Sequence, residues 1–339
     1  MRRITLCALL GSVAFGRSLA VSPSASKSSI PVSTFSIVAR DPVSGDIGVA
    51  VQSHWFSVGS VVPWAEAGVG AVATQSFVEP SYGPKGLALM KRGVAPKEAL
   101  AQLLAADGQS DVRQVAFVDG QGRVAVHTGA KCIPGAGHHE GVGYTTESNL
   151  MLTNEVPDAM ARAFEKATGP LAERMLAALD AAQGVGGDIR GKQSAAILVV
   201  RGKATDKPWT DRIVDLRIED HPEPLKEMRR LLTLHRAYEM MNRGDDASAV
   251  GKMDVALKEY GGAAAMVPDN DEFVFWAAVA LVSNERVDDA LPLFAKAFRM
   301  NPSWMLLVPR LPAVGQLPGT PGLVPRILAV GPSAEPKPK

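Results

Sequence analysis

The chain has 339 residues, of which 46% are hydrophobic and 21% charged, a composition typical of globular proteins and unlike that of disordered or fibrous ones. It carries 36 lysine and arginine residues against 35 aspartate and glutamate residues, so the formal net charge is +1. This balance gives no electrostatic reason to expect a nucleic-acid partner.

The first twenty residues have the pattern of a secretory signal peptide. A pair of arginines precedes an apolar run that ends at Phe15, and a small residue, Ala20, stands where cleavage is expected. The run is shorter than the roughly 20 apolar residues of a membrane-spanning helix. We therefore predict that residues 1–20 are removed and that the protein is exported, to the periplasm or the cell exterior, without an integral membrane segment. A frayed N-terminal helix is the alternative.

Residues 21–33 are rich in serine, proline and lysine, and we predict a flexible leader. Cleavage of the signal removes Cys7, which leaves Cys132 without a partner for an intramolecular disulfide. The stability of the mature protein must then come from its hydrophobic core.

The segment from Thr34 to Ser53 predicts a β-hairpin. Apolar and polar residues alternate through Arg40, turn residues follow, and Ile47 to Val51 is apolar on both faces. A strand with two apolar faces is expected at the centre of a covered sheet. A further apolar run, Val69 to Thr74, predicts a third strand.

Helical spacing of leucines and methionines predicts two short helices, Pro84 to Arg92 and Pro96 to Ala106, each ended by a glycine. A second hairpin is expected from Gln114 to Val118 and from Gly122 to Thr128, because an Asp-Gly turn joins these segments.

The following segments alternate between strand and helix patterns. Gly141 to Leu152 is expected to contain a strand, and Asp158 to Gln183 has a helical period interrupted by Pro170. Gln193 to Arg201 predicts a buried strand, and Ile213 to Ile218 an edge strand. This order fits two packed sheets with helices outside them.

From Leu225 the pattern predicts helices alone. Residues of the same kind recur 34 positions apart: Ala256 and Ala290, Tyr260 and Phe294, Ala263 and Ala297, Pro268 and Pro302. This recurrence resembles the second helix of a tetratricopeptide (TPR) repeat. Gly244-Asp245-Asp246 falls where the opening helix of the first repeat should be continuous, so we expect that repeat to be irregular there.

Two repeats are fewer than the usual stable minimum of about three. We therefore predict that a helical domain at residues 225–312 docks on the first domain or on a partner protein. The proline-rich segment 318–339 is predicted to be disordered.

Four segments resemble the DUF1028 family: Thr34 to Ser53, Val62 to Ser76, Tyr82 to Leu89 and Gly187 to Ala196. They occur in order, and the resemblance assigns residues 34–220 to one domain. The family is grouped with the N-terminal nucleophile (Ntn) hydrolases, whose fold stacks two antiparallel sheets between helical layers. The resemblance thus implies an α+β protein with a four-layer αββα sandwich, followed by the small all-α TPR-like lobe.

The same resemblance makes Thr34 the candidate nucleophile. In Ntn hydrolases the first residue of the leading strand attacks an amide carbonyl, and its own α-amine, with a pKa of about 7.7 to 8.0, acts as the base. This chemistry needs a free amino group, yet signal cleavage leaves residues 21–33 in front of Thr34. Either a second cut frees Thr34, or Thr34 is only a strand residue.

Polar residues at the ends of the neighbouring strands are further candidates. We predict that Ser53 and Gln75 take part in catalysis and that His54, Thr74 and Ser76 contact the substrate, with oxyanion donors from the third strand. Capping of strand ends is the alternative interpretation of these residues.

The loop before the buried strand at Gln193 is dense in polar groups. We predict that Asp188, Arg190 and Gln193 bind the substrate, because arginine suits the bidentate recognition of a carboxylate. Alternatively, Asp188 and Arg190 pair with each other and fix the loop.

A metal site at His127, His138, His139 and Cys132 is disfavoured, because no further ligand stands at helical spacing and structural zinc needs four ligands. We predict neither a metal nor a cofactor. Cys132 as a nucleophile would need a nearby base that the sequence does not reveal.

Together these features predict an exported Ntn-type amidohydrolase for a small amide or peptide-like substrate. The candidate partners are a protein that binds the helical lobe and a second copy of the chain in a homo-oligomer. The alternative is a binding module that keeps the fold without catalysis.

Overall fold

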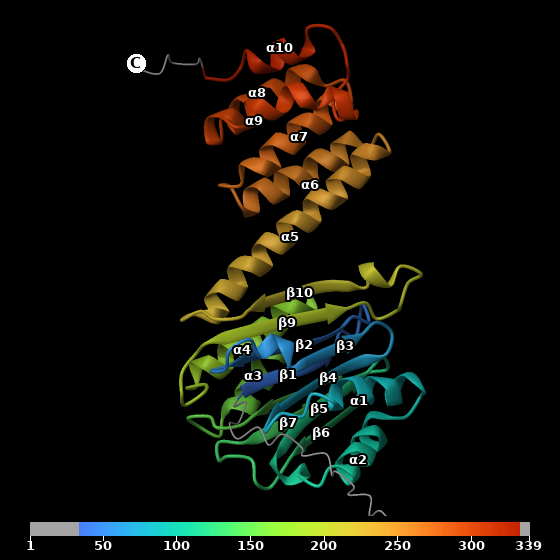
Figure 1. Ribbon diagram of the computed structural model, residues 1–339, viewed down its shortest axis with the longest axis vertical. Helices are drawn as coiled ribbons and strands as arrows, with labels where there is room; N and C mark the ends of the chain where they lie inside the picture. The colour runs from blue at the N-terminus through green and yellow to red at the C-terminus, as the bar shows by residue number, and fades with distance from the viewer. Residues whose placement is uncertain (1–33, 333–339) are drawn as a thin grey trace, which may run out of the picture.

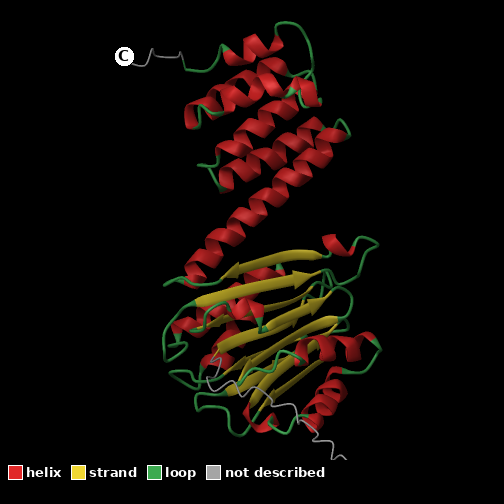
Figure 2. Cartoon of the chain, viewed as in Figure 1, coloured by secondary structure: helices red, strands yellow, loops and turns green. Residues whose placement is uncertain are grey.

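The computed structural model describes residues 34–332. The predicted signal peptide and leader, and the last seven residues of the predicted tail, lie outside the described residues. Two antiparallel β-sheets with flanking helices form the first part of the chain, and a helical region forms the second (Figures 1 and 2). No described helix is long and apolar enough to cross a bilayer.

The larger sheet has six strands in the order β10-β9-β2-β1-β8-β7. Its strands are β1 (Thr34–Arg40), β2 (Ile47–Ser53), β7 (Gly137–Gly141), β8 (Tyr144–Ser148), β9 (Ser194–Val200) and β10 (Arg212–Ile218). Every residue of β2 is buried between β1 and β9, so the predicted central position of the first hairpin is confirmed.

The smaller sheet has four strands in the order β3-β4-β5-β6. They are β3 (Pro63–Glu66), β4 (Gly70–Ser76), β5 (Arg113–Asp119) and β6 (Val124–Thr128). The sequence patterns missed β3 and β7. Both are edge strands; β3 has only four residues and begins with proline, while β7 reads Gly-His-His-Glu-Gly and has no apolar residue.

Helices cover the outer face of each sheet. They are α1 (Tyr82–Lys91) and α2 (Pro96–Ala106) on the smaller sheet, and α3 (Val156–Lys166) and α4 (Leu171–Gly184) on the larger one. Phe35 of β1 shares a core with Met175 of α4, and Phe117 of β5 shares another with Leu87 of α1. A Cβ atom at Gly86 would lie only 2.5 Å from Phe117, so glycine permits the close approach of α1.

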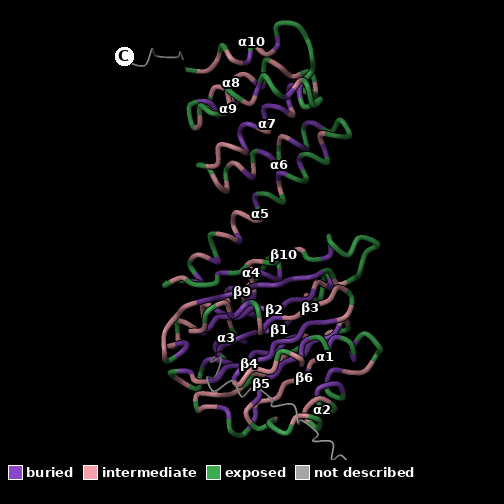
Figure 3. Tube along the Cα trace, in the orientation of Figure 1, coloured by how far each residue is buried: buried purple, intermediate pink, exposed green. Residues whose placement is uncertain are grey.

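The inner faces of the two sheets form a third core. Val49 and Val51 of β2 pack there with Ala71 and Ala73 of β4. Figure 3 shows these strands as mostly buried, in purple. The order is therefore helices, sheet, sheet, helices, as the strand and helix patterns predicted for two packed sheets.

One long helix, α5 (Pro224–Ala249), belongs to two cores. Leu225 and Leu232 in its first half pack in the core of the larger sheet, whereas Ala237 and Met241 in its second half pack among the later helices. Among the described residues, α5 is the part of the helical region that enters the core of the larger sheet. Figure 1 shows α5 rising from β10 toward the remaining helices.

The helical region continues with α6 (Met253–Met266), α7 (Asp271–Ser283), α8 (Val287–Met300), α9 (Trp304–Leu307) and α10 (Leu323–Leu328). Short 3-10 turns occur at Val58–Ser60, Ser110–Val112, Pro208–Thr210, Val308–Arg310 and Pro312–Val314. Tyr260 in α6 and Phe294 in α8, 34 residues apart, are both buried. Their helices end two residues before Pro268 and Pro302 respectively.

Two expectations for this region are wrong. The predicted irregularity at Gly244 is absent, and α5 runs through it; a Cβ atom there would lie 2.3 Å from the Tyr260 ring, so glycine makes room for that ring. The predicted disorder from residue 318 does not hold for α10. Leu323 and Ile327, one helical turn apart, are buried in the helical core and keep this segment folded.

We expect Phe294→Ala to unfold the helical region. Phe294 is fully buried and its ring contacts Phe275 in an edge-on arrangement, with centroids 5.7 Å apart. Truncating a buried phenylalanine costs about 3–5 kcal/mol. Chemical denaturation followed by circular dichroism would measure the loss. The matched control, Leu306→Ala, removes a side chain that is 69% exposed and should leave the transition in place. An unchanged midpoint for Phe294→Ala would contradict the assigned packing.

Candidate functional site

The candidate site lies at the end of the two sheets where β1 begins. Thr34 is opposite Ser53 in the β1–β2 register, and Ser53 is opposite Ser194 in the β2–β9 register. Phe35 points to the helical side of the sheet, so Thr34 and Ser36 point between the sheets. The antiparallel pairing thus collects polar residues from strands that are distant in the sequence.

Polar side chains fill the space between the sheets at this end. All of these side chains are completely buried. They belong to Thr34, Ser36, Ser53, Gln75, Gln114, Glu147, Asn149 and Ser194. Buried polar groups usually have hydrogen-bond partners, and such bonds link Thr34, Ser53, Gln75, Gln114 and Asn149 into a network.

Thr34 lies within this network. Its Oγ1 donates to the Ser53 Oγ at 3.3 Å, and its carbonyl oxygen accepts from the Asn149 backbone N–H at 3.1 Å and from Gln75 Nε2 at 3.5 Å. The structure therefore brings together Thr34, Ser53 and Gln75, the three residues predicted for catalysis.

Gln114 of β5 is the centre of the network. Its Oε1 accepts from Gln75 Nε2 at 2.8 Å and from Asn149 Nδ2 at 2.9 Å. Its Nε2 donates to Thr128 Oγ1 and to the carbonyl oxygens of residues 137 and 148. Sequence analysis did not identify Gln114, although it is a polar residue in phase with the inward-facing Ala116.

Glu147 of β8 was also missed. It is fully buried, and it is opposite Ser36, whose Oγ donates to Glu147 Oε1 at 3.2 Å. Burial raises the pKa of the Glu147 carboxyl group well above its ordinary value, and the Ser36 hydrogen bond only partly opposes this rise. Burial thus favours the protonated, uncharged form of Glu147.

Backbone strain is present at the same end of the sheets. Ser76, the last residue of β4, has φ of 68°, and Leu150, just after β8, has φ of 58°. Positive φ is uncommon outside glycine and is often found at functional sites.

The loop residues predicted to bind substrate are joined to each other. The His54 backbone N–H donates to Asp188 Oδ2 at 3.1 Å, and Asp188 forms an ion pair with Arg190 at 2.8 Å. The Asp188 side chain is completely buried. This geometry matches the second of the two interpretations above, in which the pair fixes the loop beside the end of β2.

Thr74 and Gln193 direct their side chains to other partners. Thr74 Oγ1 donates to the carbonyl oxygen of Glu79 at 3.2 Å, on the α1 side of the smaller sheet, as expected from its phase with Val72. Gln193 Nε2 donates to Asp220 Oδ1 at 3.0 Å near the surface. Only the backbone of Gln193 contacts the candidate site, through the carbonyl oxygen of Ser53.

A family model described as a family of unknown function, DUF1028, matches residues 34–228. The chain belongs to the DUF1028 family. The resemblance inferred from the four sequence segments is thus confirmed, and the match reaches into α5. The crystal structure of protein SPO2555 from Silicibacter pomeroyi, also assigned to DUF1028, is similar, with 31% identity over 59% of this chain and 84% of that chain and a TM-score of 0.53. No protein with a curated description matches the chain significantly.

The three histidines and the cysteine that were weighed for a metal site have separate partners. His127 contacts the carbonyl oxygen of Ser110, His138 contacts Thr128, and His139 contacts Asp158. Residues 34–332 contain no cluster of three or more histidine, cysteine or acidic side chains suited to a metal ion. Burial raises the pKa of the Cys132 thiol, which disfavours the thiolate that a cysteine nucleophile needs.

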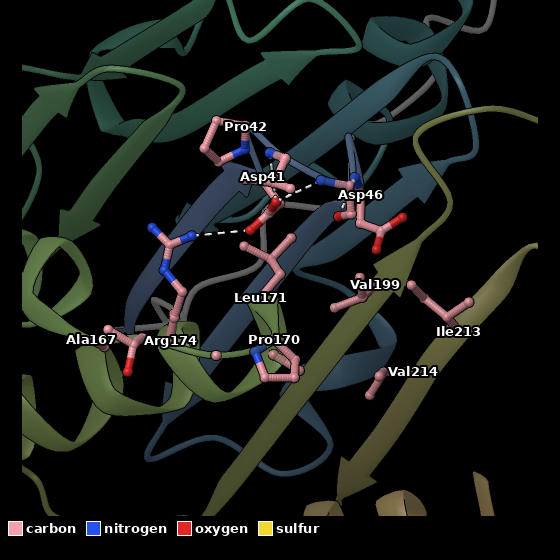
Figure 4. A pocket seen from close by; sticks show the side chains of 15 residues that line it. Asp41, Pro42, Asp46, Ala167, Pro170, Leu171, Arg174, Val199, Ile213 and Val214 are labelled. Atoms are coloured by element: carbon pink, nitrogen blue, oxygen red, sulfur yellow. Dashed lines mark hydrogen bonds and ion pairs between the residues drawn. The ribbon is translucent and has the colours of Figure 1, made fainter. Parts of the chain in front are cut away.

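The DUF1028 domain also has a cavity of about 510 Å³ at the opposite end of the larger sheet. Figure 4 shows Arg174 of α4 reaching toward Asp41 after β1, at 3.1 Å, beside the apolar side chains of Val199 and Val214. None of the predicted site residues lines this cavity. The candidate site therefore remains the polar network around Thr34.

We expect Glu147→Gln to change how stability depends on pH. Folded Glu147 keeps its proton after the unfolded chain has released it, at a pKa of about 4.3. The free energy of unfolding should therefore fall as pH rises from there toward the raised pKa, by about 1.4 kcal/mol for each unit. Glutamine does not titrate, so the free energy of unfolding of the variant should not fall in this way. The variant should therefore become more stable relative to the original chain as pH rises.

Urea denaturation between pH 4 and pH 8 measures this difference. Glu140→Gln, the same change at an exposed position on β7, is the matched control and should leave the pH profile unchanged. Parallel profiles for Glu147→Gln and the original chain would show that Glu147 is ionised in the folded protein.

Proposed function

We propose that the protein is an exported Ntn-type amidohydrolase that cleaves an amide or peptide-like bond with Thr34 as nucleophile. The observation that carries this proposal is that the family match begins at residue 34, and that the Thr34 hydroxyl lies in a buried polar network with Ser53.

The layer order supports the proposal. Two facing sheets between α1 and α2 on one side and α3 and α4 on the other match the αββα sandwich of Ntn hydrolases. We further infer that α5 to α8 form two TPR-like repeats, because residues 34 positions apart occupy equivalent buried positions in α6 and α8.

The proposed reaction follows from the chemistry of an N-terminal threonine. The hydroxyl oxygen attacks the substrate carbonyl while its proton passes to the free α-amine of the same residue. The resulting ammonium returns a proton to the leaving amine, and water then hydrolyses the ester. Gln75, by donating to the carbonyl oxygen of Thr34, would hold the nucleophile in place.

This reaction requires a cut between Ser33 and Thr34. With Ser33 attached, the Thr34 nitrogen belongs to a peptide bond and cannot accept the proton. The same observation favours the alternative function, a binding module, for any form of the protein that keeps residues before Thr34.

The nucleophile is tested by pairing mass spectrometry with mutagenesis. Active protein should contain a chain that begins at Thr34. Thr34→Ala should reduce amidase activity by about 10⁴-fold or more with little change in stability, and Thr34→Ser should keep part of the activity. Thr168→Ala, at an exposed threonine after α3, is the control and should retain full activity. Turnover by protein that still carries Ser33 would exclude the mechanism.

Export is tested by the N-terminus of the protein in each cell fraction. We expect the exported form to have lost residues 1–20, because the apolar run is recognised and cleaved as a signal. Leu9→Arg, which places a charge within that run, should retain the full-length chain in the cytoplasm. Intact Met1 on the original chain in the cytoplasmic fraction would contradict this localisation.

A further inference from the structure

Glu147 is a buried acid to which the reaction above gives no role. It lies between the sheets, opposite Ser36 on the strand that begins with Thr34. Ser36 donates to its Oε1 at 3.2 Å, while its Oε2 is buried and has no hydrogen-bond partner within residues 34–332. A buried carboxyl oxygen without a donor marks a place where a donor or a cation is missing.

No described neighbour supplies a positive charge to Glu147 Oε2. His138, opposite Glu147 on β7, has its Nδ1 bonded to Thr128 Oγ1 at 2.9 Å, and burial lowers the pKa of its ring, so it is neutral. Cys132 follows β6 and is an uncharged thiol. The facing strands β4 and β5 present the amides of Gln75 and Gln114. In the uncut chain, burial without a charged partner therefore favours the protonated form of Glu147.

A cut before Thr34 would create a cation at this end of β1. Thr34 and Ser36 are two residues apart on one strand, so their side chains share a face and lie about 7 Å apart. The new ammonium would thus form near the residue that binds Glu147. At such a distance in a buried environment, opposite charges attract far more strongly than they do in water.

We propose that Glu147 is the counter-ion of the α-ammonium group that Thr34 gains when the chain is cut before it. The proposal rests on the proposed function, because it assumes that cut. The proton balance is closed: the carboxyl group loses one proton and the neutral amine gains one, while the Ser36 hydroxyl continues to donate to Glu147 Oε1. Glu147 is in this sense a positioning residue, which raises the proton affinity of the catalytic base.

The test compares the full chain with a chain that begins at Thr34; both contain all the described residues. In the shorter chain, the ¹³C chemical shifts of Thr34 followed against pH report the pKa of its amine. Glu147→Gln should lower that pKa by about one unit, because it removes the nearby negative charge. Glu147→Asp should restore part of the shift, whereas Glu140→Gln, an exposed control on β7, should have no effect.

A second measurement needs no variant. Infrared spectroscopy at neutral pH should detect a buried protonated carboxyl group in the full chain and lose that band in the chain that begins at Thr34. A band that persists after the cut, or an amine pKa that is the same with and without Glu147, would overturn the proposal. Neither readout uses amidase activity. An amine pKa that depends on Glu147, in a protein without amidase turnover, would support this inference and contradict the hydrolase function. Turnover by a protein whose amine pKa does not depend on Glu147 would do the reverse.

Discussion

The pairing register of β1 is the constraint on which the candidate site depends. Thr34 is opposite Ser53 on one side, and Ser36 is opposite Glu147 on the other. A slip of one residue would turn Thr34 and Ser36 toward α4 and bring Phe35 between the sheets. Phe35 is fully buried against the helical side, so its burial opposes that slip and holds the polar face in position.

The same register explains why the site is both polar and enclosed. Six strands contribute one or two polar side chains each, and the amide of Gln114 joins those of Gln75 and Asn149. Satisfied networks of this kind rigidify a core, whereas a single unsatisfied member is costly. Three buried oxygens of this cluster, Gln75 Oε1, Asn149 Oδ1 and Glu147 Oε2, have no hydrogen-bond partner within residues 34–332, and Glu147 is the acid among them. The cluster would therefore respond to any new charge near it.

The helical region is joined to the sheets in a different way. Because α5 contributes Leu232 to one core and Ala237 to the other, a single continuous helix connects the two parts of the chain. Each part has its own apolar core and can be destabilised separately. The direction of α5 therefore governs where the later helices lie relative to the DUF1028 domain (Figure 1).

Much of the fold could be read from local patterns. The first hairpin, the two short helices after β4, the break at Pro170 and the change to helices at Leu225 all depend on residues close together in the chain, and the structure contains each of them. Edge strands were missed because β3 and β7 carry too few apolar residues to show a period. The helix at Leu323 was missed because prolines before it suggested disorder, while its stability comes from burial against distant helices.

For the site, the sequence by itself determined the strand ends and the candidate nucleophile, because a threonine at the start of a strand is a local feature supported by family resemblance. Tertiary structure decided the rest. Only strand order could bring Glu147 and Gln114 to Thr34, since they are more than 75 residues away in the chain and β8 lies beside β1 through non-local pairing. Only loop packing could show that Asp188 and Arg190 pair with each other. Contacts between distant segments depend on which faces meet, and periodicity within one segment does not contain that information.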